Sequence, residues 1–194
     1  MTATPFDFGS DSGTYTLNNT GARKEIVFYA RPTTARRAFE VGVLTLDVFH
    51  RMHPEYVINF IGWDISEYNI PFPHKNLGIL SPKELNELYN NCAASLVMSL
   101  TNMSLLPLEL LSSGCIPVVT DGDNNRLVSN DPFIKYAEKD PVSLAKALSE
   151  VVERQDLPEY ASMASASVKN ANWDESGDKV VKAVAEAYHV DGNG

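Results

Sequence analysis

Short apolar runs typical of buried strands alternate with helix-like stretches from about residue 25 to the end of the chain. The runs with strand character are residues 26–30, 56–61, 76–80, 94–99 and 116–120, and a sixth is expected within 133–137. Longer stretches between and after them, such as 34–52 and 140–153, keep apolar residues at helical spacing. Strands that alternate with helices need crossover connections. The pattern therefore predicts an α/β fold, a doubly wound, Rossmann-like parallel sheet of about six strands with helices on both faces.

Local signals mark two helix ends. Ser81 is a favourable N-cap, Pro82 suits the first helical position, and Glu84 completes a capping box. Gly114 follows the short helical stretch 105–113, as expected of a residue just past a helix C-terminus.

The chain divides into three parts by composition. Residues 1–24 are rich in Gly, Ser, Thr, Asn and Asp, and predict an extended lead-in, not a packed element. Residues 25–155 hold the alternating pattern, and residues 156–190 hold two final helices, near 158–169 and 174–189. We therefore expect one binding domain with a segment on either side.

Ligands of such sheets bind beyond the carboxyl ends of the strands. Polar residues are concentrated directly after the expected strands, at 31–33, 62–64, 81–82, 101–104 and 121–126. This edge of the sheet is therefore the predicted binding site.

Charge narrows the ligand class. The formal net charge of −9 argues against nucleic acid as a partner. Even so, one acid and five basic residues lie between positions 23 and 37: Arg23, Lys24, Arg31, Arg36 and Arg37. Cations at the start of a helix are unfavourable because they oppose its dipole, and an anion bound between them removes this cost. This basic segment predicts a small anionic ligand, the alternative being solvated surface arginines.

Glu109 is an isolated acid in an apolar helical stretch. A carboxylate there is costly when buried and unpaired. Aimed at the edge of the sheet, it could accept hydrogen bonds from two neighbouring hydroxyls, as a ribose presents. The alternative is a structural ion pair.

The sequence carries no motif for other classes of site. The sequence has no Cys/His metal spacing, no GxGxxG and no P-loop, so no metal ion or cofactor is expected. It shows no signal peptide and no apolar stretch of membrane-spanning length. Cys92 and Cys115 are expected to be buried free thiols. Together these features predict a cytoplasmic protein.

Three segments carry a family resemblance. Residues 101–120 (TNMSLLPLELLSSGCIPVVT) resemble the donor-site signature of retaining GT-B glycosyltransferases of family 4, and 29–37 (YARPTTARR) look like that family's basic segment. Residues 29–32 (YARP) and 76–81 (NLGILS) are similar to a branch with rhamnosyltransferases that use dTDP-sugars. The resemblance covers about residues 25–150 and implies the C-terminal, donor-binding half of a GT-B fold.

The resemblance implies roles for individual residues. Arg31 and Arg36 would bind the pyrophosphate, and Glu109 the ribose hydroxyls. Backbone groups near Leu80 would meet the base, and amides near Leu105 and Leu106 would help to hold the phosphates. Thr101 stands where the family has the first glutamate of its motif, which contacts the donor sugar; softer polar contacts there would come from Asn102 and Ser104.

The implied function is a glycosyltransferase donor domain that binds a dTDP- or UDP-linked sugar for transfer to a polysaccharide or other glycan. The acceptor would bind an N-terminal domain that this chain lacks, so catalytic residues are unassigned and the isolated domain would be inactive. The resemblance is compatible with peripheral membrane association of the full-length protein. Two alternatives stay open: a degenerate donor-like scaffold in polysaccharide biosynthesis, and an unrelated doubly wound domain such as a response regulator.

Overall fold

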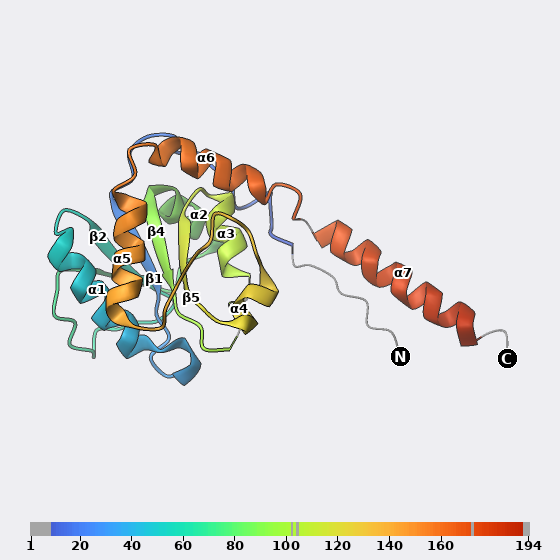
Figure 1. The fold of residues 1–194 in the computed structure, drawn as a ribbon, viewed down its shortest axis with the longest axis horizontal. Helices are drawn as coiled ribbons and strands as arrows, with labels where there is room; N and C mark the ends of the chain where they lie inside the picture. The colour runs from blue at the N-terminus through green and yellow to red at the C-terminus, as the bar shows by residue number, and fades with distance from the viewer. Residues whose placement is uncertain (1–8, 102, 104, 172, 192–194) are drawn as a thin grey trace.

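A computed structural model describes residues 9–101, 103, 105–171 and 173–191 (Figure 1). Six strands form one sheet in the order β3-β2-β1-β4-β5-β6, and every neighbouring pair is parallel. The strands are β1 (Glu25–Tyr29), β2 (Val57–Ile61), β3 (Lys75–Gly78), β4 (Cys92–Val97), β5 (Ile116–Thr120) and β6 (Lys135–Ala137). The predicted doubly wound parallel sheet is confirmed.

Helices cover both faces of this sheet. The helical elements of the chain are the 3₁₀ turn η1 (Ala35–Arg37), α1 (Phe39–Met52), α2 (Pro82–Asn91), α3 (Leu106–Ser112), α4 (Asp123–Val128), α5 (Pro141–Val152), α6 (Leu157–Ser167) and α7 (Trp173–Asp191). α1 and α5 lie side by side on one face, and α2 and α3 lie on the other (Figure 1). Because both faces are covered, every residue of β4 and β5 is buried.

Two helix ends follow the local chemistry that the sequence predicts. The Ser81 side chain accepts a hydrogen bond from Glu84 N, and the Glu84 carboxylate accepts one from Ser81 N, so the predicted capping box is confirmed. Gly114 has a φ of 73° directly after the α3 cap, a conformation that favours glycine. Helix α4 forms in the polar segment after β5, where the sequence predicts no helix.

The continuous helix expected over 34–52 is wrong. Ala38 has a φ of 42° and separates η1 from α1. The break lets Arg36 O accept a hydrogen bond from Leu100 N at 3.0 Å, which ties η1 to the chain after β4. This tertiary contact overrides the helical periodicity, and it places Arg36 and Arg37 ahead of α1 instead of in its first turn.

The first helix approaches the sheet very closely at Gly42. A Cβ atom on Gly42 would collide with the Phe28 ring of β1. Phe28 is fully buried and meets Phe39 and Phe60 in an aromatic cluster. The missing side chain of Gly42 therefore sets the spacing between α1 and the sheet.

The lead-in up to residue 24 is irregular, but its described part is packed, which corrects the expectation of an unpacked segment. The Asn90 side chain accepts from Asn18 N at 2.6 Å and Asn19 N at 3.0 Å, and donates to Thr16 O at 2.8 Å. Two asparagines of α2, Asn86 and Asn90, thus bind the backbone of this segment in place of a neighbouring strand.

Arg23 joins the lead-in to the ends of two helices. Its side chain donates to Tyr89 O and Cys92 O at the end of α2, to Ser113 O at the end of α3, and to Asn19 O, at 2.9–3.1 Å. Arg23 is 2% exposed. Carbonyl groups at helix C-termini favour a cation, so Arg23 has a structural role. The basic residues between positions 23 and 37 therefore do not all belong to one site.

The C-terminal helix extends away from the body of the domain (Figure 1). Before this helix begins, Ser10 N donates to Ala171 O at 2.8 Å, which ties the lead-in to the chain between α6 and α7. Val180, Val181 and Val184 on α7 are exposed. Within the described residues, no helix combines the length and apolar character needed to cross a membrane.

Candidate functional site

A cavity of about 420 Å³ opens at the carboxyl edge of the sheet, beside the ends of β1 and β4. Three arginines line it. Its walls come from the lead-in, the chain after β1, α2 and the start of α3, and consist of Tyr15, Tyr29, Arg31, Thr34, Arg36, Arg37, Leu85, Tyr89, Leu105, Leu106 and Glu109. Arginines, one acid and three tyrosines thus face a common space, which suits a ligand with phosphate and apolar or aromatic parts.

Arg31 follows β1 directly and is held by Tyr29. Its Nη2 donates to the Tyr29 hydroxyl at 2.6 Å, and its guanidinium carbon lies 5.2 Å from the centre of the Tyr29 ring. Gly62, at the end of β2, leaves room for this ring, since a Cβ there would lie 2.8 Å from a Tyr29 ring carbon. Gly62 also has a φ of 92°. The two strand ends together fix the position of the guanidinium.

Arg36 and Arg37 enter the cavity from η1. Arg36 Nη1 donates to Thr101 Oγ1 at 3.4 Å, across from the chain after β4. Burial lowers the pKa of Arg37, and the neighbouring charges of Arg36 and Arg31 lower it further. The cavity therefore holds positive charges that repel one another when no anion is present.

Glu109 lines the cavity from α3. Burial raises the pKa of its carboxyl group. Burial, together with the charge of Glu109, raises the pKa of Tyr15 to about 12 and that of Tyr89 well above its usual range. No ion pair involving Glu109 occurs within the described residues, so the structural alternative for this acid is not supported.

The structure thus brings together five of the residues singled out by the resemblance: Arg31, Arg36, Leu105, Leu106 and Glu109. Thr101 is beside the cavity through its hydrogen bond with Arg36. Leu80 packs against the hydrophobic core and does not line the cavity; Leu85 and Tyr89 of α2 face it instead. Asn102 and Ser104 lie outside the described residues. The ligand roles of all these residues stay predictions.

Sequence reasoning missed the tyrosine side of the cavity. Tyr15 comes from the lead-in, whose packing on α2 had no signal in the sequence. Tyr29 lies in the segment that carries the resemblance, although no role was assigned to it. Arg37 belongs to the basic segment but was not placed in the donor site.

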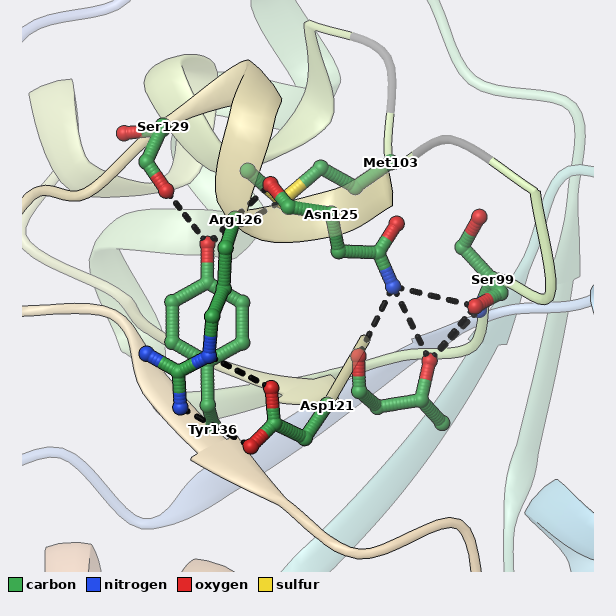
Figure 2. A network of polar contacts seen from close by, with 8 residues as sticks. Ser99, Met103, Asp121, Asn125, Arg126, Ser129 and Tyr136 are labelled. Atoms are coloured by element: carbon green, nitrogen blue, oxygen red, sulfur yellow. Dashed lines mark hydrogen bonds and ion pairs between the residues drawn. The ribbon is translucent and has the colours of Figure 1, made fainter. Parts of the chain in front are cut away.

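The polar residues after β5 serve mainly to build the edge of the sheet (Figure 2). Asp121 forms a bidentate ion pair with Arg126, with N–O distances of 2.6 and 2.8 Å, and Arg126 lies 4.5 Å from the centre of the Tyr136 ring. Asn125 donates to Ser99 O and Thr120 O, which joins the ends of β4 and β5. These contacts explain why a polar segment here does not extend the basic cavity.

Arg23 and Lys24, the other basic residues between positions 23 and 37, do not line the cavity. Arg23 is buried among helix carbonyl groups, and the Lys24 ammonium lies 5.2 Å from the centre of the Tyr56 ring, at the start of β1. Of the five, Arg31, Arg36 and Arg37 line the cavity.

Residues 24–149 match the family described as WsaF, C-terminal domain, which is more than half of the chain. The chain is also 28% identical over 165 residues to the O-antigen biosynthesis protein RfbC of Myxococcus xanthus. That match covers 82% of this chain and 13% of the Myxococcus protein, so the chain spans a small part of this relative.

Solved structures share the fold at low sequence identity. A sucrose-phosphate synthase from Thermosynechococcus elongatus has a TM-score of 0.74 at 13% identity, with 94% of this chain and 52% of that chain covered. Anabaena Alr3699/HepE in complex with UDP and glucose has a TM-score of 0.69 at 13% identity, covering 91% and 55%.

A third solved structure with this fold is that of a C-terminal domain by itself. The C-terminal domain of a glycosyl transferase group 1 family protein (LpcC) from Francisella tularensis has a TM-score of 0.62 at 12% identity, covering 84% of this chain and 97% of that one. The fold is therefore that of the C-terminal half of a GT-B glycosyltransferase.

Proposed function

This chain belongs to the family of the WsaF C-terminal domain, and from that premise we propose that it binds the nucleoside diphosphate of a sugar donor. The whole protein would be a glycosyltransferase of polysaccharide or other glycan assembly. The observation that carries the proposal is the arrangement of Arg31, Arg36 and Glu109 around one cavity at the carboxyl edge of the sheet.

The cavity provides a complement for each part of the donor. The guanidinium groups of Arg31 and Arg36 would donate to the pyrophosphate. Leu105 and Leu106 line the same cavity, and their amides would help to hold the phosphates. Glu109 would accept hydrogen bonds from the ribose. Leu80, from its position after β3, would approach the base through its backbone, with Leu85 and Tyr89 as the apolar surface within the cavity.

Family 4, a dTDP-sugar donor and a rhamnosyl branch are the finer parts of the proposal. They are supported by the segments 29–37, 76–81 and 101–120. The RfbC protein of Myxococcus xanthus is named for O-antigen biosynthesis, and the HepE structure is described with UDP and glucose. Both names are compatible with a nucleotide-sugar donor here and with a cytoplasmic site of assembly.

The acceptor would bind to a second, N-terminal domain. We assign residues 25–155 to donor binding and residues 156–190 to the approach of that second domain, with 1–24 as the connection. The exposed valines of α7 and the tie between Ser10 and Ala171 support this assignment. The donor domain alone would bind nucleotide and transfer nothing.

A second candidate function is a non-catalytic donor-like scaffold. Thr101 favours it, because a hydroxyl replaces the acid that the family resemblance places at this position. Sugar transfer by the complete protein distinguishes the two candidates: substitution of Glu109 abolishes transfer if the domain is catalytic. A complete protein that binds its partners but never releases nucleoside diphosphate from a sugar donor would support the scaffold.

Binding of UDP and dTDP, measured by calorimetry, tests the proposal. We expect dissociation constants between about 1 μM and 1 mM for at least one of the two nucleotides, the range that corresponds to −8 to −4 kcal/mol. Absence of binding at millimolar nucleotide would contradict it.

A further inference from the structure

The three arginines of the cavity differ in how their side chains are already used. Arg31 is bonded to the Tyr29 hydroxyl, and Arg36 to Thr101 Oγ1. The Arg37 side chain has no hydrogen bond or ion pair within the described part of the chain, although its backbone N is bonded to Thr34 O. All donors of this guanidinium are therefore available to a ligand.

Arg37 is also only partly exposed to solvent. A half-buried cation beside two others is unfavourable unless an anion neutralises it. Burial, together with the charges of Arg36 and Arg31, lowers the pKa of Arg37 for the same reason. Glu109 of α3 is the one acid among the described residues that line the cavity, and burial raises its pKa and so weakens its tendency to ionise. The cavity thus has an excess of positive charge that an anion would relieve.

The charge of the ligand changes during the proposed reaction. The bond between the anomeric carbon of the sugar and the terminal phosphate breaks, and its electron pair stays on the phosphate oxygen. The acceptor oxygen bonds to that carbon and gives up its proton to a base. The terminal phosphate carries one charge while it is esterified to the sugar, and as the free end of the diphosphate it carries about −1.5 to −2 at pH 7.

We infer that Arg37 binds the terminal phosphate of the released nucleoside diphosphate, so that the cavity holds this product more tightly than the intact sugar donor. The inference rests on the proposed function and deepens it. Arg31 and Arg36 would hold the pyrophosphate in both states, and Arg37 would respond to the charge that appears when the sugar leaves. The same contact stabilises the leaving group as its charge develops.

The test compares UDP with its β-methyl ester. The ester keeps both phosphates and has no sugar, but its terminal phosphate lacks the additional charge that UDP carries. The 194-residue chain is titrated with each ligand by calorimetry, as the parent sequence and as Arg37→Gln; dTDP and its β-methyl ester form a second pair. Arg51→Gln is the matched control, because Arg51 is an exposed arginine of α1 whose ion pair with Asp47 lies outside the cavity.

The parent chain is expected to bind at least one diphosphate several-fold more tightly than its ester. Arg37→Gln should weaken diphosphate binding about tenfold or more, the scale of a charge-assisted hydrogen bond, and change ester binding by less than about threefold. Arg51→Gln should change neither. Thermal unfolding of each variant verifies that the fold is retained.

The inference is overturned if Arg37→Gln leaves diphosphate binding unchanged, or weakens both ligands of a pair equally. Either result leaves the proposed function intact, because the parent chain still binds nucleotide. If the parent chain binds neither UDP nor dTDP, the proposed function fails and the inference with it.

Discussion

Arg36 and Thr101 meet at the carboxyl edge of the sheet, where Arg36 Nη1 donates a hydrogen bond to Thr101 Oγ1 at 3.4 Å. The backbone repeats the connection, because Leu100 N donates to Arg36 O at 3.0 Å. The chain after β4 therefore positions a proposed phosphate-binding residue of η1. Threonine leaves the charge of this arginine uncompensated, whereas the glutamate expected from the family resemblance would partly neutralise it.

Thr101→Glu should weaken UDP binding about three- to fivefold. A carboxylate beside Arg36 would compete with phosphate for the guanidinium, and an exposed ion pair contributes at most about 1 kcal/mol. Calorimetry measures the effect, with Thr101→Gln as the uncharged control of the same size. Equal or tighter UDP binding by Thr101→Glu would show that Arg36 does not contact the phosphates.

Glu109→Gln should weaken UDP binding about tenfold, because a charged acceptor of two ribose hydroxyls is replaced by a neutral one. The loss should be smaller for dTDP, whose sugar has no 2′-hydroxyl. Glu87→Gln, an exposed position on α2, is the control for removal of one acid. An identical loss for both nucleotides would contradict the proposed ribose contact.

The same substitution should stabilise the ligand-free domain at neutral pH. Burial raises the pKa of Glu109, so the folded state disfavours the ionised carboxyl. The wild type should lose stability relative to Glu109→Gln as pH rises from about 4.3, the usual glutamate value, through the raised pKa. Urea unfolding between pH 4 and 8 measures this difference. A difference that does not change with pH would contradict the assigned burial effect.

The strands and the capped helix α2 could be predicted because their signals are local. Alternating apolar runs located every strand within a few residues, and Ser81 with Glu84 located the start of α2. The break at Ala38 could not be predicted, because its cause is the contact of η1 with Leu100, distant in sequence.

The candidate site could be predicted where it follows from chain order. Arg31 comes directly after a strand, so its place at the carboxyl edge follows from the topology of a parallel sheet. Tyr15 and Tyr89 could not be placed, because they meet only when the lead-in packs on α2; their ring centres lie 6.1 Å apart. Arg23 could not be placed from the sequence either. It belongs to the basic segment that predicts an anionic ligand, but its side chain binds carbonyl groups at helix ends.

Gly42→Ala should lower the free energy of unfolding by about 1–3 kcal/mol, since the added methyl group collides with the Phe28 ring between α1 and β1. Gly177→Ala is the matched control on α7, where a Cβ meets no atom within 4 Å. Urea denaturation compares the two. Equal stability of both variants would show that α1 can move away from the sheet without cost.

Arg23→Met should lower the free energy of unfolding by about 3 kcal/mol. Methionine has an apolar side chain of similar length but cannot donate hydrogen bonds to the carbonyl groups at the ends of α2 and α3, as Arg23 does. Arg51→Met, at an exposed ion pair, should change stability by less than about 0.5 kcal/mol. If the two variants unfold alike, Arg23 does not have the structural role assigned to it.

The most direct test of the donor site is calorimetric titration of the chain and of Arg31→Ala with UDP and dTDP. We expect micromolar to millimolar binding of at least one nucleotide by the unsubstituted chain. In the variant we expect at least about a tenfold loss, since a charged hydrogen bond to phosphate disappears. Nucleotide binding that Arg31→Ala leaves unchanged would contradict the site.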